Sequence, residues 1–127
     1  MPKQYINPEG YYKTENYSHA VKVGNTIYIA GVVGVDDKGR TFGDGSIVTQ
    51  VDKAYENLKL VLAAAGATME DLVSTRVYLT RARDFEVYKA TRMKHMKKPN
   101  PGLTVLIVKA LGRADLLFEM EAIAVIG

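Results

Sequence analysis

Apolar and polar residues alternate along two short stretches near the N-terminus. Residues 19–23 read His-Ala-Val-Lys-Val, and residues 26–30 read Thr-Ile-Tyr-Ile-Ala. Gly24 and Asn25 separate the two stretches, and both residue types favour the tight primed turns that join neighbouring strands. The pattern predicts a β-hairpin. A further short strand is predicted around Tyr5–Ile6.

The hydrophobic period lengthens to three or four residues after Ser46. Apolar residues recur at Ile47, Val51, Ala54, Leu58, Val61 and Ala65. This spacing predicts a helix of about five turns with one apolar stripe. Ser46 is a suitable N-cap, and Gly66 follows as a C-terminal stop. Residues 68–71 then resemble a short capping box.

The second half of the chain returns to strands around one more helix. Strands are predicted at residues 73–79, 103–108 and 116–125. Asp84 is expected to cap a helix that runs to about Met96, and the prolines at Pro99 and Pro101 end it. The predicted order is β-β-α-β-α-β-β, which is an α+β fold.

Two helices can cover only one face of a sheet with five or six strands. Residues 27–35 and 103–108 are nevertheless apolar on both sides of their pleat. Strands buried on both faces need a second covering layer, and this chain has no further element to supply it. The sequence therefore predicts a homo-oligomer.

Length and composition narrow the class of protein. A chain of 127 residues is expected to form one domain, residues 1–127. It has no cysteine, so thiol nucleophiles and zinc–thiolate sites are excluded. No apolar run approaches the ~18 residues of a membrane span, and no signal-type segment is visible. We therefore expect a cytoplasmic protein with no membrane partner.

The net charge of +3 comes mainly from a basic segment between Lys89 and Lys98. One interpretation is that these cations complement the dipole at the end of a helix and solvate its outer face. The other is a patch for nucleic acid or another anion. We favour the first, because no aromatic stacking platform accompanies the charges.

Few residues indicate chemistry by their spacing alone. Glu119 and Glu121 lie two apart in a strand, so both carboxylates point to one face, where one could act as a general base. A solvated face, or ion pairing with Arg76, is the simpler interpretation. His19 and His95 have no companion at ligand spacing, so no metal site is predicted. No nucleotide-binding or serine-hydrolase motif is present.

Four segments taken together resemble a known family. They are residues 17–31 (YSHAVKVGNTIYIAG), 50–66 (ending ENLKLVLAAAG), 71–80 (DLVSTRVYLT) and 119–125 (EMEAIAV). On these segments the chain is similar to the Rid family of YjgF-like imine and enamine deaminases, also labelled L-PSP endoribonucleases and translation inhibitors. The resemblance runs from about residue 8 to residue 126.

The resemblance implies a chorismate-mutase-like fold, a barrel-shaped homotrimer and ligand clefts between subunits, with no metal or organic cofactor. The family's catalytic glutamate falls on Glu119 and its active-site tyrosine on Tyr17. Gly31 matches the glycine that ends the second hairpin strand. The serine commonly found before that glycine is replaced by Ala30, and Lys89 stands where many members have asparagine.

The family's substrate-binding arginine does not carry over. Aligning the strand puts Pro101-Gly-Leu103-Thr104 where the family has P-A-R-[ST], so Leu103 occupies the arginine position. A leucine cannot pair with a carboxylate, so the usual 2-imino acids are not expected as substrates. Three functions stay open, in this order: a deaminase or hydrolase acting on an imine or enamine, a non-catalytic metabolite-binding protein, and an RNA-binding or RNA-cleaving protein.

Overall fold

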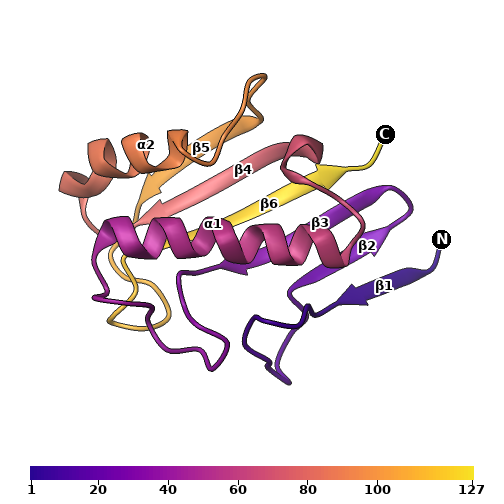
Figure 1. Ribbon diagram of the computed structural model, residues 1–127, viewed down its shortest axis with the longest axis horizontal. Helices are drawn as coiled ribbons and strands as arrows, with labels where there is room; N and C mark the ends of the chain where they lie inside the picture. Colours follow the sequence, from indigo (N-terminus) through magenta and orange to yellow (C-terminus); the bar gives the residue numbers. More distant parts are fainter.

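The computed structural model describes residues 1–127, and six strands form one sheet in the order β1-β2-β3-β6-β4-β5 (Figure 1). The strands are β1 (Lys3–Ile6), β2 (Ala20–Val23), β3 (Thr26–Val32), β4 (Leu72–Leu79), β5 (Gly102–Ile107) and β6 (Phe118–Val125). The helices are α1 (Ile47–Ala64) and α2 (Phe85–Met93), with 3₁₀ turns η1 (Met69–Asp71) and η2 (Ala82–Asp84). Neighbouring strands pair antiparallel except β4 and β5, which are parallel.

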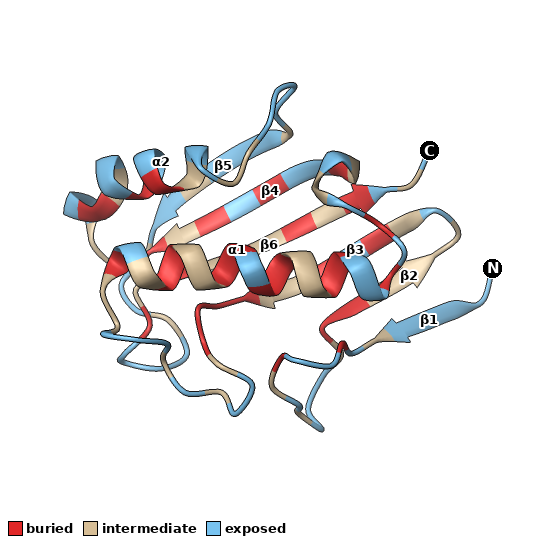
Figure 2. Cartoon of the chain, viewed as in Figure 1, coloured by how far each residue is buried: buried red, intermediate tan, exposed pale blue.

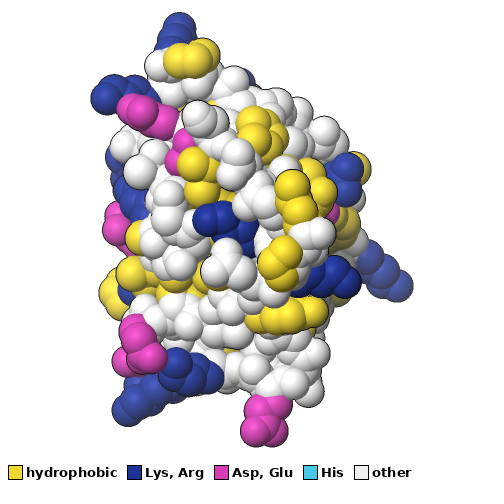
Figure 3. Space-filling model, turned by 90° about the vertical axis from the view of Figure 1, so that its right-hand side faces the viewer, with side chains coloured by type: hydrophobic (Ala, Val, Ile, Leu, Met, Phe, Trp, Pro, Cys, Tyr) yellow, Lys and Arg dark blue, Asp and Glu magenta, His cyan; other side chains and the backbone are white.

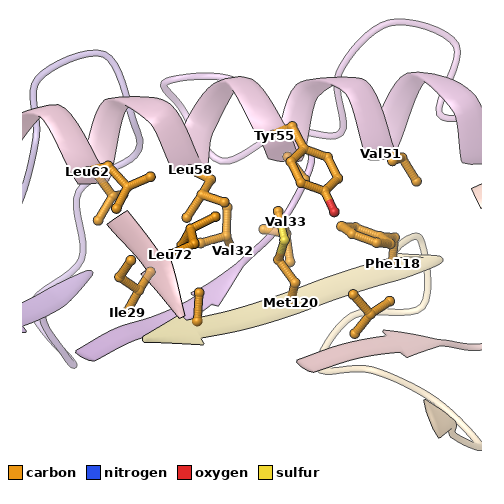
Figure 4. Close-up of a cluster of buried hydrophobic side chains, with 14 of the residues drawn as sticks. Ile29, Val32, Val33, Val51, Tyr55, Leu58, Leu62, Leu72, Phe118 and Met120 are labelled. Atoms are coloured by element: carbon orange, nitrogen blue, oxygen red, sulfur yellow. The ribbon is translucent and has the colours of Figure 1, made fainter. Parts of the chain in front are cut away.

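Both helices lie on the same face of the sheet, as the sequence predicts (Figure 1). The buried residues concentrate between α1 and the central strands (Figure 2). Tyr55, Leu58 and Leu62 point from α1 toward the sheet; Tyr55 lies beside Phe118 of β6, and Leu62 lies over Ile29 of β3 (Figure 4). This single layer of apolar contacts holds the helices on the sheet.

The opposite face of the sheet carries large apolar side chains and has no covering element. Tyr28 of β3 is 52% exposed and Val73 of β4 is 48% exposed. At the end of the molecule that carries both termini, groups of hydrophobic side chains reach the surface among lysines and arginines (Figure 3). The sequence predicts that the two helices cover only one face of the sheet. In the single chain the other face is indeed uncovered.

The predicted caps of the first helix are present. Ser46 accepts a hydrogen bond from the backbone N–H of Thr49, and Gly66 adopts a φ of +82° just beyond the helix. Residues 68–71 form the predicted capping box, in which Asp71 accepts from the backbone N–H of Thr68 at 2.8 Å.

The second helix differs from its prediction. It ends at Met93 rather than near Met96, and the Asp84 side chain does not cap it. Asp84 instead pairs with Arg81 at 2.7 Å. Beyond the helix, Lys94 and His95 bind Asp52 of α1, so part of the basic segment joins the two helices.

Gln50, a buried polar residue of α1, holds two neighbouring loops. The Gln50 amide donates to the carbonyls of Gly45 and Asp115, and its oxygen accepts from the backbone N–H of Leu117 at 2.8 Å. This last bond explains why β6 begins at Phe118 and not at Leu116, as the sequence suggests. No helix of the chain is long and apolar enough to cross a membrane.

Candidate functional site

A bulge in β3 creates a close approach between Gly31 and Glu119. Ile29 pairs with Ala122 and Val32 with Met120, so β3 has one more residue than β6 between these pairs. The Glu119 side chain lies directly against Gly31. A Cβ at this position would overlap Glu119 Oε2 and lie 2.9 Å from its carboxyl carbon. Glycine therefore allows Glu119 to approach the backbone closely in its present orientation, and it does not serve a left-handed backbone conformation here.

Glu119 lies in a partly desolvated environment. Its side chain is half-buried on the open face, opposite to the face on which Phe118 and Met120 are buried. Burial raises the pKa of Glu119 above its ordinary value, and the nearby charge of Glu121 acts in the same direction. A carboxylate with a raised pKa is a stronger base when ionised, which suits it to proton abstraction.

A cluster of aromatic rings from the N-terminal loop lies beside Glu119. The Tyr12 hydroxyl hydrogen-bonds the Tyr17 hydroxyl, and the charge of Glu119 is among the factors that raise the pKa of Tyr12. His19 is buried, its Nε2 lies 2.7 Å from the carbonyl oxygen of Tyr12, and its ring packs against Tyr17 at 5.6 Å between centroids. Tyr11 is also buried, and its hydroxyl accepts from the backbone N–H of Val33. These contacts fix the loop and keep the hydroxyls of Tyr12 and Tyr17 together.

Tyr12 and His19 were not singled out as site residues by the sequence. The available signal was the run Tyr11-Tyr12 ahead of Tyr17, but which ring reaches Tyr17 depends on the loop path that His19 anchors. No group of three or more His, Cys, Asp or Glu side chains is arranged to hold a metal ion.

Glu121 has a different role from Glu119. It accepts hydrogen bonds from the Tyr78 hydroxyl at 2.7 Å and from Arg76 at 3.2 Å. The ion-pair interpretation from the sequence therefore holds for Glu121, whereas Glu119 makes no ion pair. The two carboxylates share a face but only one of them is free of a cation.

The sequence-predicted residues fall into two groups within the chain. Gly31 and Glu119 are in contact, with Ala30 beside Gly31 in the bulge, and Tyr17 is linked to this group through Tyr12, on which the charge of Glu119 acts. Leu103 and Thr104 lie on β5, and Lys89 on α2. Leu103 pairs with Thr75 of β4, which pairs with Ala122 of β6, so β4 lies between the two groups.

The register also separates the two β5 residues from one another. Leu103 shares the helix-covered face with buried Thr75, whereas Thr104 shares the open face with Arg76. Leu103 is still 41% exposed, because β5 is an edge strand that the helices cover incompletely. Lys89 is exposed as well, with its ammonium 5.4 Å from the centroid of the Phe85 ring.

The sequence and the fold both match known proteins. The family model described as Endoribonuclease L-PSP matches residues 10–126. The chain is 36% identical to a RutC family protein of Pyrococcus abyssi over 85% of this chain and 84% of that protein. It is also 36% identical to the 2-iminobutanoate/2-iminopropanoate deaminase of Mus musculus, over 87% of this chain and 82% of that protein.

Comparison of the fold with solved structures leads to the same family as the sequence comparison. The crystal structure of RidA from an Antarctic Psychrobacter superposes with a TM-score of 0.90 at 32% identity, covering 97% of this chain and 99% of that one. The chain therefore has the fold of the Rid proteins and belongs to the Endoribonuclease L-PSP family, as its sequence motifs predict.

Proposed function

We propose that this protein is a cofactor-independent deaminase that hydrolyses an imine or enamine in a pocket between subunits. The observation that carries the proposal is the half-buried Glu119 carboxylate, which is free of any cation, is seated on Gly31, and acts by its charge on Tyr12, the hydrogen-bond partner of Tyr17. The relatives named 2-iminobutanoate/2-iminopropanoate deaminase support the same reaction class.

Imine hydrolysis needs a base and few other groups. The Glu119 carboxylate would take a proton from water while the water oxygen bonds to the imine carbon and the C=N electron pair moves to nitrogen. The proton then passes to that nitrogen, and the resulting carbinolamine expels ammonia and leaves a carbonyl compound. Tyr17 and Tyr12 would hold the substrate and the water by hydrogen bonds.

A pocket of this kind would be completed by a second copy of the chain. Leu103 lies on the helix-covered face of the sheet and across β4 from Glu119, which lies on the open face, so Leu103 and Glu119 of one chain do not line the same cavity. The uncovered face of the sheet supports self-association. A homotrimer is proposed from the resemblance to the family, with residues 1–127 as one domain in each subunit and Lys89, Leu103, Thr104, Ala30 and Gly31 lining the pocket.

The substrate would be less anionic than a 2-imino acid. Leu103 offers a hydrocarbon surface where the family motif has an arginine, and burying a carboxylate against it without a cation is unfavourable by several kcal/mol. An imine or enamine of neutral or bulkier character fits this surface better.

The test is to supply imines generated from a range of amines and amino acids and to measure ammonium and carbonyl release. We expect turnover of at least one neutral imine and a fall of roughly two to four orders of magnitude in kcat for Glu119→Gln. Glu121→Gln is the control and should keep most of the activity. Ligand binding without turnover in the native protein would favour a metabolite-binding protein over a deaminase.

A further inference from the structure

A cavity of about 880 Å³ lies apart from the candidate catalytic residues. Its walls come from the C-terminal half of α1, the turn at η1 and the segment 95–101 that joins α2 to β5. None of Tyr17, Gly31, Glu119, Lys89 and Leu103 lines it. Its volume is in the range of cavities that bind small molecules.

The floor of this cavity is apolar. Ala67 and Leu72 are buried beneath it, and Met69 and Met96 pack on the hydrophobic core from its two sides. Ala63 is exposed to the cavity from α1. A hydrocarbon or aromatic group entering here would leave water and contact carbon and sulfur atoms.

The rim of the cavity is cationic. Lys59, Lys97 and Lys98 line it against a single acid, Glu70. Lys97 and Lys98 form no ion pair, so their charges are not neutralised within the chain. The apolar floor and positive rim therefore complement a molecule that has an apolar body and an anionic end.

One wall of the cavity is fixed by a chain of polar contacts. His95 is stacked on the buried Tyr55 ring at 5.0 Å between centroids, and its Nε2 donates to Asp52 at 2.7 Å. Since the Asp52 carboxylate can only accept, Nδ1 is left to face the Lys59 ammonium, 3.5 Å away. The ammonium group of Lys59, which also pairs with Glu56 at 3.5 Å, is thereby held at the cavity wall by residues of α1 and of the turn that follows α2.

We propose that this cavity is a second ligand site, which binds a small amphipathic anion: an aromatic or aliphatic carboxylate, sulfonate or phosphate. The apolar body would lie on Ala63, Met69 and Met96, and the anionic group would meet Lys59, Lys97 and Lys98. Because no catalytic candidate lines the cavity, the ligand would be bound and released unchanged.

The probe for this site is anilinonaphthalene sulfonate, which has an aromatic body and one sulfonate. Its fluorescence gives the affinity, and the methyl signals of ¹³C-methionine-labelled protein give the location. We expect the signals of Met69 and Met96 to shift on titration, while those of Met93 and Met120, which do not line the cavity, stay in place.

Two variants test the two halves of the site. Ala63→Phe fills the cavity from an exposed position and should abolish binding, whereas Ala64→Phe, one residue along the same helix and outside the cavity, should not. The double variant Lys97→Glu, Lys98→Glu should weaken binding roughly five- to tenfold relative to Lys3→Glu, Lys38→Glu.

Binding that is unaffected by Ala63→Phe, or shifts that spare Met69 and Met96, would overturn the proposal. An RNA surface would give a different result: steeply salt-dependent binding of a polyanion such as poly(A), reduced by the lysine variants but not by Ala63→Phe. That outcome, without binding of the sulfonate, would also overturn the proposal.

Discussion

The carboxylate of Glu119 rests on the Cα of Gly31, with no room for a side chain between them. The bulge in β3 brings the glycine to this position, and the next strand of the sheet supplies the acid. The proposed catalytic base, Glu119, can therefore take this orientation only because residue 31, on the neighbouring strand, has no methyl group.

Replacing Gly31 with alanine is therefore expected to displace the Glu119 side chain. We predict a loss of at least about 100-fold in kcat with a small change in melting temperature, since a displaced base no longer meets the substrate. Gly112→Ala is the matched control, because a Cβ at Gly112 has no atom within 4 Å. Full activity in Gly31→Ala would remove the argument for Glu119 as the base.

Restoring an arginine at Leu103 tests the substrate preference. Leu103→Arg is expected to raise kcat/KM for 2-iminobutanoate by about tenfold or more, mainly through a lower KM, because a guanidinium pairs with the substrate carboxylate. Val48→Arg is the control: Val48 is exposed to a similar degree, 38% against 41% for Leu103, but it lies on α1, away from β5 and from the open face of the sheet. Equal effects of the two substitutions would contradict the placement of Leu103 in the pocket.

The raised pKa of Glu119 predicts how the rate changes with pH. The rate should rise as Glu119 ionises, with a midpoint above the ordinary glutamate value of 4.5. Replacing Glu121 with glutamine removes a neighbouring negative charge, so it should move this midpoint down. A pH–rate profile of native protein and Glu121→Gln measures both effects.

The raised pKa of Glu119 also predicts how the stability of the folded chain changes with pH. The change is opposite to that caused by an acid in an ion pair, because an ion pair lowers the pKa of the acid. Between 4.5 and its higher folded value, Glu119 binds more protons in the folded chain than in the unfolded chain, so it reduces stability as pH rises through this window. Glu119→Gln should therefore raise the melting temperature at pH 7 and leave it nearly unchanged at pH 4. A lower melting temperature at pH 7 would contradict the desolvation of Glu119.

The buried amide of Asn57 should be important for stability rather than for chemistry. It donates to the carbonyls of Val33 and Val35 at 2.9 and 3.0 Å, which holds the segment that follows β3 on α1. Asn57→Asp keeps the shape but turns an acceptor toward two carbonyls, so we expect a loss of about 2–4 kcal/mol in urea unfolding at fixed protein concentration. Glu56→Gln, on the exposed side of α1, should cost far less.

Local patterns predicted most of the fold, because each element carries its own signals. The strand alternation, the stripe and caps of α1 and the box at Thr68 depend on neighbouring residues. The end of α2 was predicted wrongly because Lys94 and His95 bind Asp52, which is 42 residues away from Lys94 in the sequence.

The sequence predicted less of the candidate site than of the fold. Glu119 and Glu121 have the same spacing pattern and the same residue type, and only the position of Arg76 and Tyr78 across the sheet distinguishes them. The approach of Tyr12 to Tyr17 depends in the same way on a loop that no local periodicity describes. Contacts between distant segments decide which of several similar residues is available for chemistry.

Strand β4 lies between Glu119 and Leu103 in each chain. Two variants that are each inactive should therefore be able to restore activity when they assemble together. If each pocket takes its base from one subunit and its β5 wall from a neighbour, a Glu119→Gln chain and a Leu103→Glu chain are inactive for different reasons. When the two are co-expressed, some pockets combine the intact half of each. Two inactive proteins would then complement one another in a mixed oligomer, whereas simple blending of stable, preassembled oligomers would restore nothing.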